Sequence, residues 1–199
     1  MTKLVQGIGF NEKDYTRLNN GKQLKEYALW NSMLLRCTQK YWDKKPTYAG
    51  VTCSENFKSF SFFFDWCQNQ VGFGNTDDDN ISWHLDKDIL IKGNKVYSED
   101  NCVFVPSRIN SLLIKHESSR GGFPIGVDLY KRTNKYRSAA TVGKGTQKHL
   151  GYYDTPHEAF AAYKVFKEQI VKDVANEYRE QLDIRAYQAL MNYEVNIDD

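Results

Sequence analysis

Apolar residues recur with helical spacing in two stretches of the N-terminal third. The first stretch ends before Pro46 and has the stripe Leu24, Tyr27, Ala28, Leu34 and Leu35. In the second, large apolar side chains follow one another at intervals of three, four and three, at Phe57, Phe60, Phe64 and Cys67. Both stretches predict helices with one buried face. The polar residues 1–21 predict an irregular arm.

The pattern changes between residues 81 and 113. Residues 83–91 predict a strand, residues 92–95 a turn, and residues 102–105 a short return strand. Pro106 then suits the first turn of a helix, whose inward positions would be Ile109, Leu112 and Leu113. This segment therefore predicts two strands followed by a helix.

Small and polar residues at 118–122 form the best linker in the chain, and alternating strands follow it. Apolar residues alternate at Ile125, Val127 and Leu129, which predicts a first strand. Residues 135–142 predict a second strand and 147–152 a third, joined by a hairpin turn at 143–145. Three antiparallel strands are expected here.

A helix is expected directly after these strands. Thr155 and Glu158 have the spacing of a capping box, and Pro156 occupies the first helical position. The apolar stripe of this helix would be Ala159, Tyr163, Phe166, Ile170 and Val174. If the helix covers the apolar face of the sheet, the opposite face stays open, and in the second strand that face has Lys135, Arg137, Ala139 and Thr141.

Composition narrows the class of protein. The 199 residues are 41% hydrophobic with a net charge of only +2, which disfavours a disordered chain. No apolar run approaches the ~18 residues of a membrane span, and the N-terminus lacks a signal-peptide pattern. The four cysteines form no CxxC pair, which disfavours a zinc knuckle and predicts reduced thiols. We therefore expect an α+β protein of the cytoplasm that has no contact with membranes.

Charge is distributed unevenly along the chain. Residues 120–155 contain seven basic and two acidic residues, whereas 156–199 contain five basic and nine acidic ones. A basic block on a near-neutral chain is typical of phosphate binding, and a solvated charged surface is the alternative. The basic positions at the turns and edges of the predicted sheet are Lys131, Arg132, Lys144 and Lys148.

Residues 126–166 resemble the plant ethylene-response-factor (APETALA-type) DNA-binding domain. The most specific parts are the strand KYRSAA, the crossover HLGYYDTPHEAF and the alanine-rich helix. In that family the sheet contacts the major groove of double-stranded DNA. The resemblance therefore implies DNA contacts from five residues, Lys131, Arg132, Lys135, Arg137 and Lys148. A plain antiparallel sheet with one solvated polar face is the alternative.

Asp86 and Asn101 could supply hard oxygen ligands for a divalent cation, because phosphate and water often complete such a shell. Their alternative role is in turns and helix caps. The sequence LDKDILIKGNKVYSEDNCVFVPSRIN is similar to the HNH motif of phage homing and nicking endonucleases, and residues 30–67 resemble the segment that precedes it. The resemblance implies that Asp86 and Asn101 hold Mg²⁺ or Mn²⁺ and that Asn110 steadies the site.

One position departs from that family. Lys87 stands where the family usually has the histidine that activates water. A lysine with the ordinary pKa of ~10.4 is a poor general base near neutral pH, although it can neutralise phosphate charge. His84 is a possible substitute, since positions 84 and 86 share one strand face.

These features together predict an HNH-like nuclease domain at 1–117, a linker at 118–122 and a DNA-binding domain at 123–199. The expected activity is metal-dependent nicking of duplex DNA, by a phage protein that acts as a monomer in the bacterial cytoplasm. The alternative is a nuclease scaffold that has lost its base and acts only as a sequence-specific DNA-binding or regulatory protein. Lys87 favours this alternative, whereas Asp86, Asn101 and Asn110 favour the enzyme.

Overall fold

The computed structural model describes residues 4–12, 15–114, 122–143 and 145–199. The chain divides into two units, one made of residues 1–75 and 85–104, the other of 76–84 and 105–199. Each unit is described by itself. Apart from Gly122, the predicted linker lies outside the described residues.

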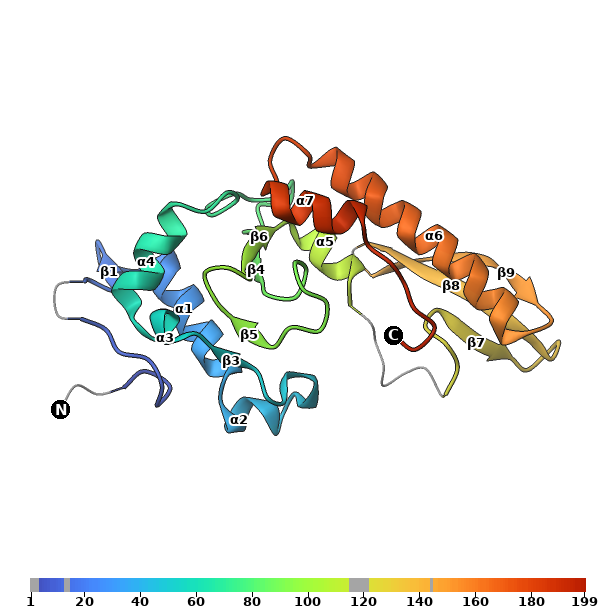
Figure 1. The fold of residues 1–199 in the computed structure, drawn as a ribbon, viewed down its shortest axis with the longest axis horizontal. Coiled ribbons are helices and arrows are strands. Elements are labelled where there is room, and N and C mark those ends of the chain that lie inside the picture. Colours follow the sequence, from blue (N-terminus) through green and yellow to red (C-terminus); the bar gives the residue numbers. More distant parts are fainter. Residues whose placement is uncertain (1–3, 13–14, 115–121, 144) are drawn as a thin grey trace. The chain divides into compact units, whose positions relative to one another are not determined.

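The first unit is built mainly from short helices (Figure 1). Their buried side chains form an aromatic core. Its helices are α1 (Lys25–Arg36), α2 (Gln39–Trp42), the 3₁₀ helix η1 (Pro46–Tyr48), α3 (Glu55–Lys58) and α4 (Phe60–Gln68). Its short strands are β1 (Leu18–Asn19), which pairs with β2 (Lys22–Gln23), and β3 (Thr52–Cys53), which pairs in parallel with β5 (Val96–Tyr97). The expected irregular arm thus includes the first strand of a small hairpin, and the second strand directly follows it.

The second predicted helix is divided in two at Ser59. This residue has an extended backbone, and its hydroxyl accepts the N–H of Phe62, which caps α4. Phe57, Phe60 and Cys67 of the predicted stripe are fully buried, but Phe64 is only partly buried and Phe63 takes the buried position instead. The indole of Trp30 on α1 joins them and donates to the Phe57 carbonyl at 2.7 Å.

The predicted strand and helix signals around residue 100 are largely present, but one strand is much shorter than expected. Strand β4 (His84–Asp86) pairs with β6 (Val103–Val105), and α5 (Ser107–Leu112) follows. The prediction of a strand up to residue 91 is wrong. The carboxylate of Asp86 accepts the backbone N–H groups of Asp88 at 2.8 Å and Ile89 at 2.9 Å, and this turn ends the strand.

The second unit confirms the predicted three-stranded antiparallel sheet on one helix. Strand β8 (Lys135–Gly143) lies between β7 (Val127–Tyr130) and β9 (Thr146–Tyr153), and α6 (Pro156–Glu177) packs on one face (Figure 1). The capping box is present: Thr155 Oγ1 accepts the Glu158 N–H at 3.2 Å, and Glu158 Oε2 accepts the Thr155 N–H at 3.1 Å. A last helix, α7 (Ile184–Met191), packs on α6.

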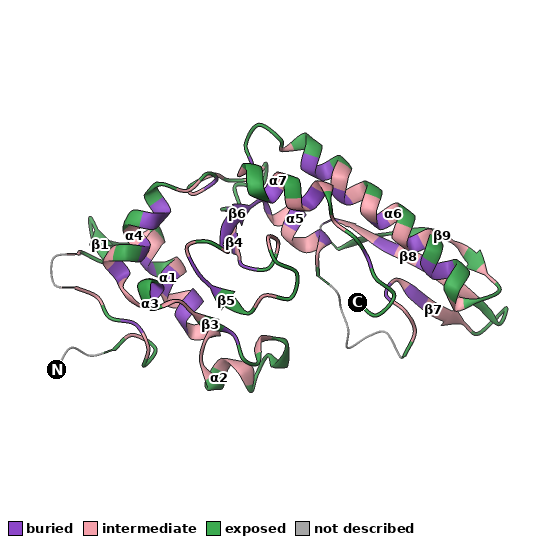
Figure 2. Cartoon of the chain, viewed as in Figure 1, coloured by how far each residue is buried: buried purple, intermediate pink, exposed green. Residues whose placement is uncertain are grey.

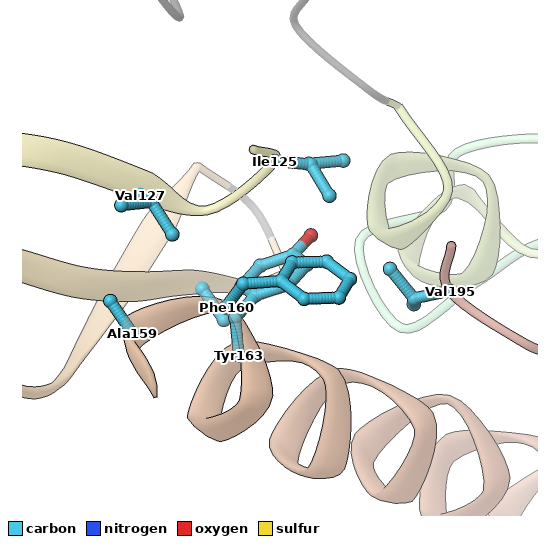
Figure 3. Close-up of a cluster of buried hydrophobic side chains, with 7 residues drawn as sticks. Ile125, Val127, Ala159, Phe160, Tyr163 and Val195 are labelled. Carbon is cyan, nitrogen blue, oxygen red and sulfur yellow. The ribbon is translucent and has the colours of Figure 1, made fainter. Parts of the chain in front are cut away.

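The core of the second unit lies between the sheet and α6. Ile125, Val127, Ala159, Phe160, Tyr163 and Val195 gather there with Ala140 (Figure 3). Gly126 has a φ of +77°, and a Cβ at this position would lie 2.0 Å from the Tyr163 ring, so only glycine fits. Helix α6 is buried on one side and exposed on the other (Figure 2).

One residue on the buried side of α6 is charged. Lys167 is only 3% exposed, and its Nζ makes no hydrogen bond or ion pair with any described residue. Burial lowers its pKa from the ordinary 10.5 to about 8.

Helix α5 also belongs to this unit. It packs against β8 and α6, and Arg108 forms an ion pair with Glu177 of α6. No helix in the described part of the chain combines the length and apolarity needed to cross a bilayer.

Candidate functional site

Asp86 lies at the turn that ends β4, where its side chain is partly buried. Burial raises the pKa of this carboxyl to about 7, and the neighbouring negative charge of Asp88 adds to the shift. The ionised form is therefore under-compensated by the protein. A divalent cation would supply the missing positive charge, so the donor chemistry at Asp86 fits Mg²⁺ or Mn²⁺.

Asn101 lies just before β6, in the same unit as Asp86. Its backbone N–H donates to the Ser98 carbonyl at 3.2 Å and to the Ser98 hydroxyl at 3.3 Å, so the residue sits in the turn between β5 and β6. The next residue, Cys102, is near Asp86. Burial raises the pKa of its thiol to about 12, and the Asp86 charge adds to this shift. Asp86 therefore ends β4, and Asn101 lies two residues before the start of β6.

Carboxylates, thiols and imidazoles do not gather at this point into a larger cluster. In the described ranges no three or more His, Cys, Asp or Glu side chains lie close enough to hold a metal ion. A site made of one carboxylate and one amide oxygen would leave most of the coordination shell to phosphate and water, as Mg²⁺ commonly accepts.

Lys87 is 9% exposed and its charge is locally compensated. Its Nζ lies 3.1 Å from Asp88 Oδ2 and 5.7 Å from the centroid of the Tyr97 ring. The backbone carbonyl of Lys87 accepts from Asn94 Nδ2 at 2.6 Å, which fixes the loop after β4. The side chain is thus a cation anchored by Asp88 and the Tyr97 ring.

His84 and Asn110 are brought together in the second unit. Asn110 Nδ2 lies 3.1 Å from His84 Nδ1, so the first residue of β4 is hydrogen-bonded to the middle of α5. This contact controls the tautomer of the imidazole. The amide nitrogen of Asn110 can only donate, so Nδ1 accepts with its lone pair and the proton of the neutral imidazole is on Nε2.

The open face of the β7–β8–β9 sheet has fewer uncompensated charges than the sequence indicates. Arg137 forms a two-pronged ion pair with Asp128, which lies opposite it in the register, with Nη2 at 2.8 Å from Oδ2. This partner holds the pKa of Arg137 above its usual value. Lys135 is paired with Asp154 at 3.1 Å. The two basic residues of this strand that are predicted to contact DNA therefore lie beside carboxylates.

The remaining predicted contacts are scattered around the sheet. Lys131 and Arg132 are exposed in the turn after β7, and Thr141 is partly exposed on the open face. Lys148 lies opposite Ala140 in the register, which places it on the helix side, and its Nζ is 4.8 Å from the centroid of the Phe166 ring. Lys144 lies outside the described residues.

Sequence reasoning missed an aromatic row on the open face. The rings of Tyr130 and Tyr152 are 5.1 Å apart, and that of His149 is 4.6 Å from Tyr152. A bulge between Ser138 and Ala139 shifts the register, so simple alternation along the third strand does not place these rings together. Exposed aromatic rings between cations suit the stacking of nucleic-acid bases.

No protein-family model, no curated protein and no solved structure matches this chain. The assignment of function therefore depends on the residues and geometry described above, together with the resemblance of the two motifs.

Proposed function

We propose that this protein is a divalent-metal-dependent DNA endonuclease of the HNH type, targeted to its site by the C-terminal sheet. The observation that carries the proposal is the 3.1 Å contact between His84 and Asn110. It joins the strand that ends at Asp86 to the helix whose asparagine, by the resemblance, steadies such a site. The proposal places the protein in the cytoplasm of a phage-infected bacterium, as a monomer on duplex DNA.

Each residue would have a distinct role. Asp86 and Asn101 would hold Mg²⁺ or Mn²⁺, which when bound polarises the scissile phosphate and stabilises the leaving 3′ oxygen. His84 would assist the attack of water by orienting it through Nε2, because the Asn110 amide occupies the lone pair of Nδ1. Lys87 would neutralise phosphate charge, because its ion pair with Asp88 suits it to a fixed electrostatic role rather than to proton transfer.

The sheet would supply target choice. Arg137, Lys135 and Thr141 share the open face, and Lys131 and Arg132 extend it at one end. Arginine and lysine on a sheet can contact base edges and phosphates in the major groove. We expect a nick in one strand, chosen by the position of this sheet on the duplex.

The second candidate is a DNA-binding or regulatory protein without cleavage. The observation in its favour is Lys87, a buried and ion-paired lysine at the position where the HNH motif usually has its histidine. Under this alternative His84 and Asn110 form a structural contact only.

A plasmid nicking assay separates the two. The full chain is incubated with supercoiled plasmid and Mg²⁺ or Mn²⁺, beside Asp86→Ala, Asn101→Ala and His84→Ala. The matched control is Asp78→Ala, an exposed carboxylate with no assigned role. Nicking by the parent and the control alone supports the enzyme. Cleavage that persists in Asp86→Ala and Asn101→Ala removes the assigned site, and binding without cleavage by any preparation favours the second candidate.

A further inference from the structure

Arg36, the last residue of α1, is a partly buried cation without a carboxylate partner among the described residues. Within the described part of the chain its guanidinium makes one hydrogen bond, from Nη1 to the hydroxyl of the buried Tyr97 at 3.3 Å. The other groups that interact with it electrostatically are also phenols, those of Tyr41 and Tyr48. These two rings contact each other edge to face at 5.1 Å.

This environment does not satisfy an arginine. The guanidinium is always charged and has five N–H donors in a planar fork, whereas a neutral phenol oxygen offers one acceptor and no compensating charge. Removing a cation from water is costly unless an anion and further hydrogen bonds replace the water. The charge and most N–H donors of Arg36 therefore suit an anion with several acceptor oxygens.

A second cation adds positive charge near Arg36. Lys87 lies near the same Tyr97 ring, with its Nζ 5.7 Å from the centroid, so Arg36 and Lys87 both contact Tyr97. Both positive charges also act on the thiol of Cys37. Asp88 offsets the charge of Lys87 at 3.1 Å, which leaves the charge of Arg36 as the surplus.

We propose that Arg36 binds a phosphate group of the DNA backbone and so acts as a positioning residue for the nuclease unit. Phosphate matches the fork of the guanidinium with two parallel N–H contacts, and the hydroxyls of Tyr41 and Tyr48 are further donors of the right kind. This inference rests on the proposed function, because it takes DNA as the ligand. It adds a contact that neither the HNH pattern nor the basic sheet includes.

The test measures binding rather than cleavage. Full-length protein is titrated in EDTA into a fluorescently labelled DNA duplex, and anisotropy is followed at several salt concentrations. Arg36→Gln should weaken binding roughly fivefold at low salt and reduce the salt slope by about 0.9, the value for one lost phosphate contact. The affinity of Arg36→Lys for the duplex should lie between those of the parent and Arg36→Gln. The matched control, Lys58→Gln, removes the same charge from a lysine of the first unit that is paired with Glu55, and should bind as the parent does.

A second measurement needs no variant. The Nε–H resonance of Arg36 in the parent is followed by NMR during addition of the same duplex, and separately of inorganic phosphate. A shift with the duplex supports the proposal. No shift with the duplex overturns it, and a shift with inorganic phosphate alone assigns the site to a free phosphate instead.

The outcomes also separate this inference from the proposed function. If the parent binds the duplex and Arg36→Gln binds as Lys58→Gln does, the phosphate contact is refuted while DNA binding stands. If the parent does not bind the duplex at all, the proposed function fails together with this contact.

Discussion

Replacing Lys167 of α6 by methionine should stabilise the second unit. The side chain is 3% exposed and has no partner among the described residues, and burial lowers its pKa to about 8. Methionine has a similar length and no charge. The substitution therefore removes the desolvation of an ammonium group and leaves the packing of α6 nearly unchanged.

The magnitude follows from the pKa. A shift from 10.5 to about 8 corresponds to about 3 kcal/mol at 1.36 kcal/mol per pKa unit. Because the pKa is lower in the folded chain than in the unfolded one, the unfolded chain binds more protons between these two values, and stability rises with pH across that interval. The parent should therefore gain about 2 kcal/mol between pH 7 and pH 9.5 from this group.

The measurement is urea unfolding of the full chain at pH 7 and pH 9.5, followed by the methyl NMR signals of Val171 and Val174, which are buried in the same helix. Lys167→Met should be more stable than the parent by about 3 kcal/mol at pH 7 and by roughly 1 kcal/mol at pH 9.5. Lys172→Met, at a less buried position on α6, serves as the control. Equal stability of parent and Lys167→Met at pH 7 would refute the argument from burial.

Three further predictions concern the site. Without metal and at a pH above 7, Asp86→Asn should have a higher thermal midpoint than the parent. The pKa of Asp86 is about 7 in the folded chain, so the folded chain binds more protons than the unfolded one between pH 4 and 7, and the parent loses stability as the pH rises through that range. Calorimetry with and without Mg²⁺ should show that the ion raises the thermal midpoint of the parent only. Asp128→Asn should free Arg137 and strengthen non-specific DNA binding up to about fivefold in a low-salt anisotropy assay, and weaker binding would contradict this. Asn110→Ala should shift the NMR tautomer signals of His84 and lower nicking at least tenfold, whereas unchanged nicking would make the contact structural.

Local signals in the sequence were sufficient for much of the fold. The capping box at Thr155 and the strand alternation after residue 125 depend on neighbours a few residues apart, and the structure confirms the sheet and helix that they predict. The prediction of a strand over 83–91 is wrong for a reason that is also local but is not visible in the alternation of apolar residues. An aspartate that bonds to the backbone two and three residues later ends β4 at Asp86.

The side-chain pairings across the sheet could not be predicted from the sequence. The spacing of Arg137 places it on the open face, but only the register shows that Asp128 lies opposite it. Burial of Lys167 was likewise hidden, because a lysine within an apolar stripe is usually assigned to the solvent side. The partners of Arg36 come from three separate segments, so spacing along the chain contains no signal for that cluster.

The ion pair from Arg108 of α5 to Glu177 of α6 bears on where the chain can be divided without loss of structure. Helix α5 completes the strand–strand–helix motif by sequence, yet its packing partners β8 and α6 come from the region resembling plant DNA-binding domains. A recombination event or a cloning boundary at residues 118–122 would strip α5 of those partners and expose Ile109 and Leu112. The segment that must stay together to keep α5 covered therefore begins before residue 118, at or before the start of α5.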